Sequence, residues 1–152
     1  VSATQVPDVS AADARYVRVS TADTIRGAKI YTSIATFNAP VATPATTVAL
    51  SAAQSVVSIS FAARNTFVVS LVSAQGCSVA APSNATAGQS GSIYLIQDGT
   101  GGSVLTYDPV WRFPNASAPS NTITASAVDL LVYNVRSATT IDAVLLKGFG
   151  RT

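Results

Sequence analysis

The sequence predicts an all-β protein: an antiparallel β-sandwich of jelly-roll type, preceded by an extended N-terminal arm. Apolar and polar residues alternate with a period of two in several short stretches, which is typical of half-buried strands. Glycine, asparagine and aspartate separate these stretches at short intervals, as turns between strands do. More than half of the chain is Ala, Ser, Thr or Val, and the β-branched residues among them fit strands better than helices. We divide the chain into an arm over residues 1–28 and a β-domain over residues 29–152.

The arm differs from the rest of the chain in its density of charged residues. Ser10 and Asp13 have the spacing of a capping box, in which two side chains satisfy the free N–H groups at a helix start. This spacing predicts a short helix that ends near Tyr16, and Pro7 helps to exclude helix before it.

The β-domain contains six stretches with strand character. The stretch over 67–72 is apolar on both faces, which predicts a central strand. Residues 98–102, with the sequence DGTGG, predict a hairpin loop that joins strands over 92–97 and 103–107, because glycine readily adopts positive φ. A second hairpin is expected around residues 136–139, between strands over 128–135 and 140–149. The alternation predicts a core made of Ile59, Phe61, Phe67, Val69, Leu71, Ile93, Leu95, Leu130, Val132, Val144 and Leu146.

Composition and charge argue against several classes of function. The chain has no histidine and one cysteine, Cys77, which excludes a Ser-His-Asp triad, a histidine metal site and an internal disulfide. Charged residues make up 11% of the chain and the net charge is +2, with no run of Lys or Arg to bind nucleic acid. No apolar stretch reaches the length of a membrane span. We therefore expect no cofactor, no metal, no nucleic acid and no membrane insertion.

The seven aspartates are the remaining candidates for catalysis, since two carboxylates can hydrolyse a glycosidic bond. A structural role is the simpler interpretation. Asp98 belongs to a predicted turn, where an aspartate hydrogen-bonds its own backbone. Asp129 and Asp142 lie near predicted strand starts, where a charge discourages edge pairing. We expect no enzymatic activity.

Aromatic and arginine residues gather at the start of a proline-rich loop over 109–121. One interpretation makes them a contact surface for a sugar or a protein, because tryptophan and arginine are enriched at binding hot spots. The other is that Trp111 and Phe113 fold back and plug one end of the sandwich. The candidate contact residues are Tyr107, Trp111, Arg112 and Phe113.

Two groups of motifs resemble proteins of the bacteriophage tail-fibre and virion-fibre family. Residues 13–18, DARYVR, and 22–31, ADTIRGAKIY, are similar to a short module of those proteins, although Asp23 stands where they often have Gln. Ile30 and Tyr31 likewise replace Thr and Phe. The second group resembles a β-domain common at the C-terminal ends of phage fibres; its stretches are 84–92 (NATAGQSGS), 97–101 (QDGTG), 111–114 (WRFP), 127–131 (AVDLL) and 141–144 (IDAV).

The resemblance implies a homotrimeric β-protein on the surface of a phage particle. The arm would be a stalk that holds the trimer or attaches it to other capsid or tail proteins, through Tyr16, Val17, Val19 and Ile25. The β-domain would be an exposed knob. Low charge suits a chain that buries surface against its own copies.

Two functions remain open from the sequence. The first is an adhesion module, a fibre or knob on tail or head that touches a glycan or protein of the host surface. The second is a decoration or cement protein that stabilises the phage head. An enzyme acting on host polysaccharide is a third, weaker hypothesis.

Overall fold

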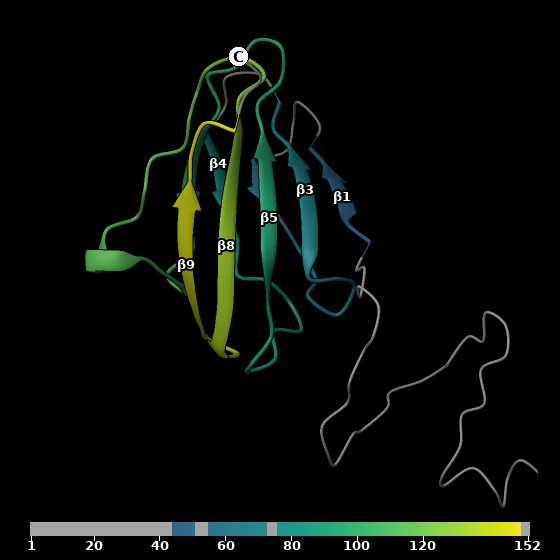
Figure 1. Ribbon diagram of the computed structural model, residues 1–152, viewed down its shortest axis with the longest axis vertical. Helices are drawn as coiled ribbons and strands as arrows, with labels where there is room; N and C mark the ends of the chain where they lie inside the picture. Colours follow the sequence, from purple (N-terminus) through teal and green to yellow (C-terminus); the bar gives the residue numbers. More distant parts are fainter. Residues whose placement is uncertain (1–43, 51–54, 73–75, 150–152) are drawn as a thin grey trace, which may run out of the picture. The chain divides into compact units, whose positions relative to one another are not determined.

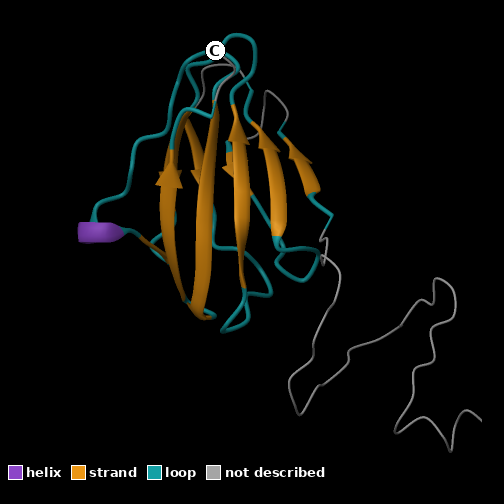
Figure 2. Cartoon of the chain, viewed as in Figure 1, coloured by secondary structure: helices purple, strands orange, loops and turns teal. Residues whose placement is uncertain are grey.

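The computed structural model describes residues 44–50, 55–72 and 76–149. These residues belong to the second of the two units into which the chain divides, residues 41–152. Figure 2 shows them as strands and loops with one short 3-10 turn. The expectation of an all-β domain is confirmed. The expected helix at 10–16 and the arm residues Tyr16, Val17, Val19 and Ile25 lie outside the described residues.

Two sheets make up the domain (Figure 1). The larger sheet has the strand order β1-β3-β5-β8-β9-β7, and the smaller has the order β2-β4-β6. The strands are β1 (Thr46–Ala49), β2 (Val56–Val57), β3 (Thr66–Ser70), β4 (Gly76–Val79), β5 (Ser90–Ile96), β6 (Val104–Tyr107), β7 (Trp111–Arg112), β8 (Val128–Ser137) and β9 (Thr140–Leu146), with the 3-10 turn η1 at Pro114–Ala116.

From β1 to β6 the chain alternates between the two sheets, so that it winds as a solenoid-like coil. Strands β1, β3 and β5 pair in parallel in the larger sheet, and β2, β4 and β6 pair in parallel in the smaller one. The predicted antiparallel sandwich of jelly-roll type is therefore wrong: the arrangement is solenoid-like, and among the described strands only β5 with β8 and β8 with β9 pair antiparallel. Alternation of apolar and polar residues is the same in parallel and antiparallel strands, and so it carries no information on direction.

Of the two predicted hairpins, one is confirmed and the other is wrong. Strands β8 and β9 pair antiparallel around the expected turn. Residues 98–102 instead carry the chain from β5 in one sheet to β6 in the other. The expected positive φ values do occur, at Gly101 (+70°) and Gly102 (+84°). Within this loop, Asp98 Oδ1 accepts hydrogen bonds from the N–H groups of Thr100 (2.9 Å) and Gly101 (2.8 Å). The loop thus forms a compact turn of its own.

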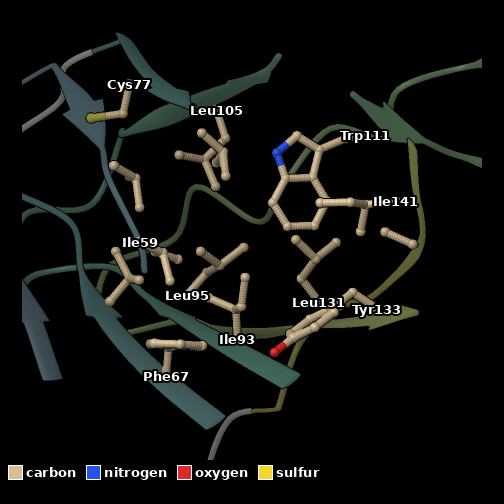
Figure 3. Packing of buried hydrophobic residues seen from close by; sticks show 14 of the residues in the cluster. Ile59, Phe67, Cys77, Ile93, Leu95, Leu105, Trp111, Leu131, Tyr133 and Ile141 are labelled. Carbon is tan, nitrogen blue, oxygen red and sulfur yellow. The ribbon is translucent and has the colours of Figure 1, made fainter. Parts of the chain in front are cut away.

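The core lies between the two sheets and is rich in aromatic contacts (Figure 3). Phe61 stacks on Tyr133 with ring centroids 4.4 Å apart, and Trp111 meets both rings edge-on at 6.4 Å. Seven of the residues predicted for the core are buried: Ile59, Phe61, Phe67, Val69, Leu71, Ile93 and Leu95. Strand β3, predicted to be central, lies between β1 and β5.

The predicted core was wrong for β8 and β9. Val132, Val144 and Leu146 are 42%, 46% and 43% exposed on the outer face of the larger sheet, and Leu130 is half-buried. The inward-facing residues are Asp129, Leu131, Tyr133, Val135, Ile141 and Ala143. Strand β8 is apolar on both faces from Leu130 to Tyr133, so its pattern suits either orientation. The orientation is set by Asp129, whose buried carboxylate has polar partners inside.

Candidate contact surface

A hollow of about 1110 Å³ lies beside β7, where the loop over 113–120 stands away from the larger sheet. Its lining includes the outer faces of β8 and β9, with Val132 and Val144, and the loop residues Pro114, Ala116 and Ala118. All four predicted contact residues, Tyr107, Trp111, Arg112 and Phe113, belong to this lining. The structure therefore brings the predicted set together, although its members have different roles.

Trp111 anchors the loop in the core. Its side chain is buried, and the indole N–H donates a 3.1 Å hydrogen bond to the main-chain oxygen of Ala80 on the facing side of the coil. Figure 3 shows the indole packed among Ile141 and other core residues. A buried tryptophan with a satisfied N–H is a packing residue. This position agrees with the alternative that Trp111 is a plug, and it argues against direct contact with a partner.

Tyr107 and Phe113 form an aromatic pair in the lining of the hollow. Their ring centroids are 4.7 Å apart in an edge-on arrangement, and both residues are half-buried. The Tyr107 hydroxyl is buried and has no hydrogen-bond partner among the residues that the structure describes. Burial, with a further contribution from the Asp129 charge, raises the pKa of Tyr107 above its usual range. Tyr107 thus contributes to the lining as the aromatic partner of Phe113.

Arg112 is exposed on the outer face of β7, next to Asp142 of β9. Asp142 forms an ion pair with Arg136, whose Nε donates to Asp142 Oδ2 at 2.9 Å. This hydrogen bond and the nearby charges of Arg136 and Arg112 hold the pKa of Asp142 below its usual value. In the described part of the chain Arg112 belongs to no ion pair. Since Arg136 already neutralises Asp142, the Arg112 guanidinium supplies the excess positive charge at this end of the hollow.

The loop beyond Phe113 is strained at its tip. Asn115 and Ala116 both have left-handed backbone conformations, with φ of +59° and +54°. This region costs an ordinary residue such as Ala116 about 1–2 kcal/mol, whereas asparagine adopts it more readily. Such strain often marks a functional segment. The two residues with this conformation follow Phe113 closely in the chain, and Ala116 belongs to the lining of the hollow.

The motif residues over 84–92 hold the backbone of the coil. Gln89 Nε2 donates to the main-chain oxygen of Phe61 (2.7 Å) and to Asn65 Oδ1 (2.9 Å), which joins the loop before β5 to the loop before β3. A β-carbon at Gly91 would overlap the main-chain oxygen of Asn65. These motif residues therefore have a structural role in this chain: they determine how the loops before β3 and β5 approach each other.

A polar network stabilises the end of the domain at which β5 ends and β8 begins. Asp129 is buried, and its two carboxylate oxygens accept hydrogen bonds from the N–H groups of Thr122 (2.6 Å) and Gly148 (2.8 Å). Asn121 Oδ1 accepts from Leu105 N–H at 2.9 Å, and Gln97 Nε2 donates to the oxygens of Ser103 and Thr122. Asp129 has a structural role, as predicted, but the physical reason differs from the predicted protection of a strand edge. The carboxylate ties two loops together inside the protein, and it does not protect a strand edge.

Three further observations concern metal binding, membrane insertion and the cysteine thiol. Over residues 44–50, 55–72 and 76–149, no three His, Cys, Asp or Glu residues come together as a metal site would require. No helix in the same ranges has the length and hydrophobicity to cross a membrane. Cys77 is buried, and burial raises the pKa of its thiol.

Comparisons with protein-family models, with curated proteins and with solved structures found no match for this chain.

Proposed function

We propose that this chain is a non-enzymatic structural protein of a bacteriophage particle, a homotrimeric fibre or knob on the virion surface that contributes to host attachment. The residues of the resemblance support this proposal because they fix main-chain geometry. Gln89 joins two loops of the coil, and Gly91 permits the approach of Asn65. Residues that determine a backbone are the part of a sequence that indicates a shared architecture.

The observation that carries the attachment role is the position of Arg112. Its exposed guanidinium lies in a hollow beside Phe113, on a strand that the buried Trp111 anchors in the core. Arginine and aromatic residues are enriched at binding hot spots. The contact surface proposed is therefore Arg112 and Phe113, with the Tyr107 ring behind them, and a glycan or a protein of the host surface as the partner.

The described carboxylates support a non-enzymatic role. Asp98, Asp108 and Asp129 accept hydrogen bonds from main-chain N–H groups, and Asp142 is paired with Arg136. Each of these groups already has a structural task. The N-terminal arm, with Tyr16, Val17, Val19 and Ile25, remains our proposal for the attachment to other virion proteins and for part of the trimer contact.

The location of the chain on the intact particle tests the proposal. Antibodies raised against the purified chain and coupled to gold would be applied to intact phage particles and imaged by electron microscopy. We expect label at the tips of fibres or knobs on tail or head. Label spread evenly over the head would favour the decoration or cement function instead, and particles that contain the chain but take up no label would contradict a surface location.

A further inference from the structure

One edge of the larger sheet is only partly paired. Strand β7 covers two residues of β9, Ile141 and Asp142. Ile141 N–H donates to the Val110 oxygen at 2.9 Å, so this peptide group faces the β7 side. Peptide groups alternate in direction along a strand, and Ala143 and Leu145 therefore direct theirs to the same side. Among the described residues, no strand pairs with β9 on that side beyond Asp142.

This unpaired stretch, Ala143 to Leu146, lacks the features that protect an edge from association. Natural edge strands carry charged residues, proline or bulges. Here the charged residues Asp142 and Lys147 flank the stretch, and the four residues between them are uncharged. Val144 and Leu146 are 46% and 43% exposed beside Val132 on the outer face. An uncharged edge next to exposed apolar side chains has the composition of an interface.

The opposite edge of the same sheet is β1. Its four residues, Thr46–Ala49, pair in parallel with β3 on one side, and no described strand pairs with them on the other. They are also uncharged and contain no proline, and Thr47 and Ala49 are exposed. Both edges therefore offer a four-residue stretch in which every second residue directs its peptide groups to the open side.

The two edges run in the same direction. Strands β1, β3 and β5 are parallel, β8 is antiparallel to β5, and β9 is antiparallel to β8. β9 is thus parallel to β1 within the sheet. If a second copy is rotated about an axis that runs along the strands, its β1 can lie beside β9 of the first copy, and the two strands are parallel. Contacts between two different surfaces close into a ring when the rotation is a simple fraction of a turn.

We propose that β1 of a second copy adds to the open edge of β9, opposite Ala143–Leu146, so that the larger sheet continues from one copy into the next. The proposal rests on the homotrimer of the proposed function and assigns its interface. Main-chain hydrogen bonds supply the affinity, as in other cases of strand addition. The added strand lies in line with β7, at the end of the hollow formed by Ala143 and Val144. Arg112 and Phe113, at β7 itself, stay open to a host partner.

The test places a lysine on each edge in turn. Thr47→Lys and Val144→Lys each add a charge at an exposed position, while Ile123→Lys makes the same change at a loop residue that is 53% exposed. The full chain and each variant are measured by light scattering at micromolar concentration, with a thermal melt to check folding. We expect three times the 15.4 kDa chain mass for the original chain and for Ile123→Lys, and the single-chain mass for both edge variants.

A charge-swap variant makes the assignment specific. In Thr47→Lys combined with Val144→Glu, every junction in the ring brings a lysine against a glutamate, and we expect the trimer to return. A monomeric original chain, or trimers that survive both edge lysines, would overturn the proposal. Dissociation by Val144→Lys but not by Thr47→Lys would also overturn it, because the strand added to β9 would then not be β1. None of these results affects the gold-labelling test, so a failed interface is distinguishable from a failed virion assignment.

Discussion

The phenol of Tyr133 donates a 3.1 Å hydrogen bond to the main-chain oxygen of Asn65, which lies 68 residues earlier in the chain. The same oxygen accepts a 2.9 Å hydrogen bond from the N–H of Ser92. One carbonyl group thus joins the loop before β3 to strands β5 and β8. Gly91 is adjacent to this junction, because any larger residue there would overlap Asn65.

Replacement of Gly91 by alanine is expected to disrupt this junction. The added β-carbon overlaps a main-chain oxygen, which cannot move without breaking both hydrogen bonds. Overpacking of this kind costs about 1–3 kcal/mol or more. Gly99→Ala is the matched control, since no atom of the described residues lies within 4 Å of its added β-carbon. Urea denaturation measures both, and equal midpoints for the two variants would contradict the account.

Stability is expected to fall at alkaline pH. Burial raises the pKa of Tyr133 from 10.0 to about 12. Between these two values the unfolded chain releases the phenol proton while the folded chain keeps it, so the free energy of unfolding decreases as the pH rises from 10 to 12. Below pH 10 the full contribution is present. Tyr107, whose pKa is raised mainly by burial, contributes in the same direction.

Chemical denaturation at a series of pH values, with two tyrosine variants, checks this assignment. Tyr133→Phe is expected to flatten the decrease between pH 10 and 12, and to lose about 0.5–1.5 kcal/mol at neutral pH with its hydrogen bond. Tyr94→Phe, on the exposed outer face, is the control for the loss of a phenol hydroxyl. An unchanged profile in Tyr133→Phe would show that other groups cause the alkaline loss.

Trp111 and Arg112 are adjacent in sequence and are expected to respond in opposite ways. Trp111→Ala removes a buried indole and its hydrogen bond to Ala80, at a cost of about 3–5 kcal/mol. Arg112→Ala removes an exposed side chain and is expected to change stability by less than about 0.5 kcal/mol. Thermal melting of both variants provides the comparison. A stable Trp111→Ala variant would mean that the indole does not anchor the loop.

The sequence could predict which stretches are strands and much of the core, because alternation reflects burial directly. Phe67 and Val69, for example, lie inside as their spacing indicates. It could not predict the pairing of β5 with β3 and β8. The turn chemistry of Asp98 and Gly101 suits a hairpin as well as a crossing between sheets. The direction of pairing depends on contacts between residues far apart in the chain.

The sequence could predict that Tyr107, Trp111, Arg112 and Phe113 lie together, but it could not predict which of them pack and which are exposed. A tryptophan beside an arginine in a loop satisfies both the binding and the packing interpretation. The structure separates them through the hydrogen bond of Trp111 to Ala80, a residue 31 positions away. The Arg136–Asp142 pair, which leaves Arg112 as the excess charge, was also missed, because charge pairing across a hairpin requires the register of β8 and β9.

The most direct test of the attachment role is a competition measurement. Purified chain is added to host cells before the phage particles that we propose carry it, and the rate of particle adsorption is recorded. We predict that the original chain slows adsorption and that Arg112→Ala, folded and equally stable, does not. Arg64→Ala, which removes another exposed arginine, is the control and should compete as the original chain does. Competition by Arg112→Ala as strong as that of the original chain would contradict the proposed contact surface.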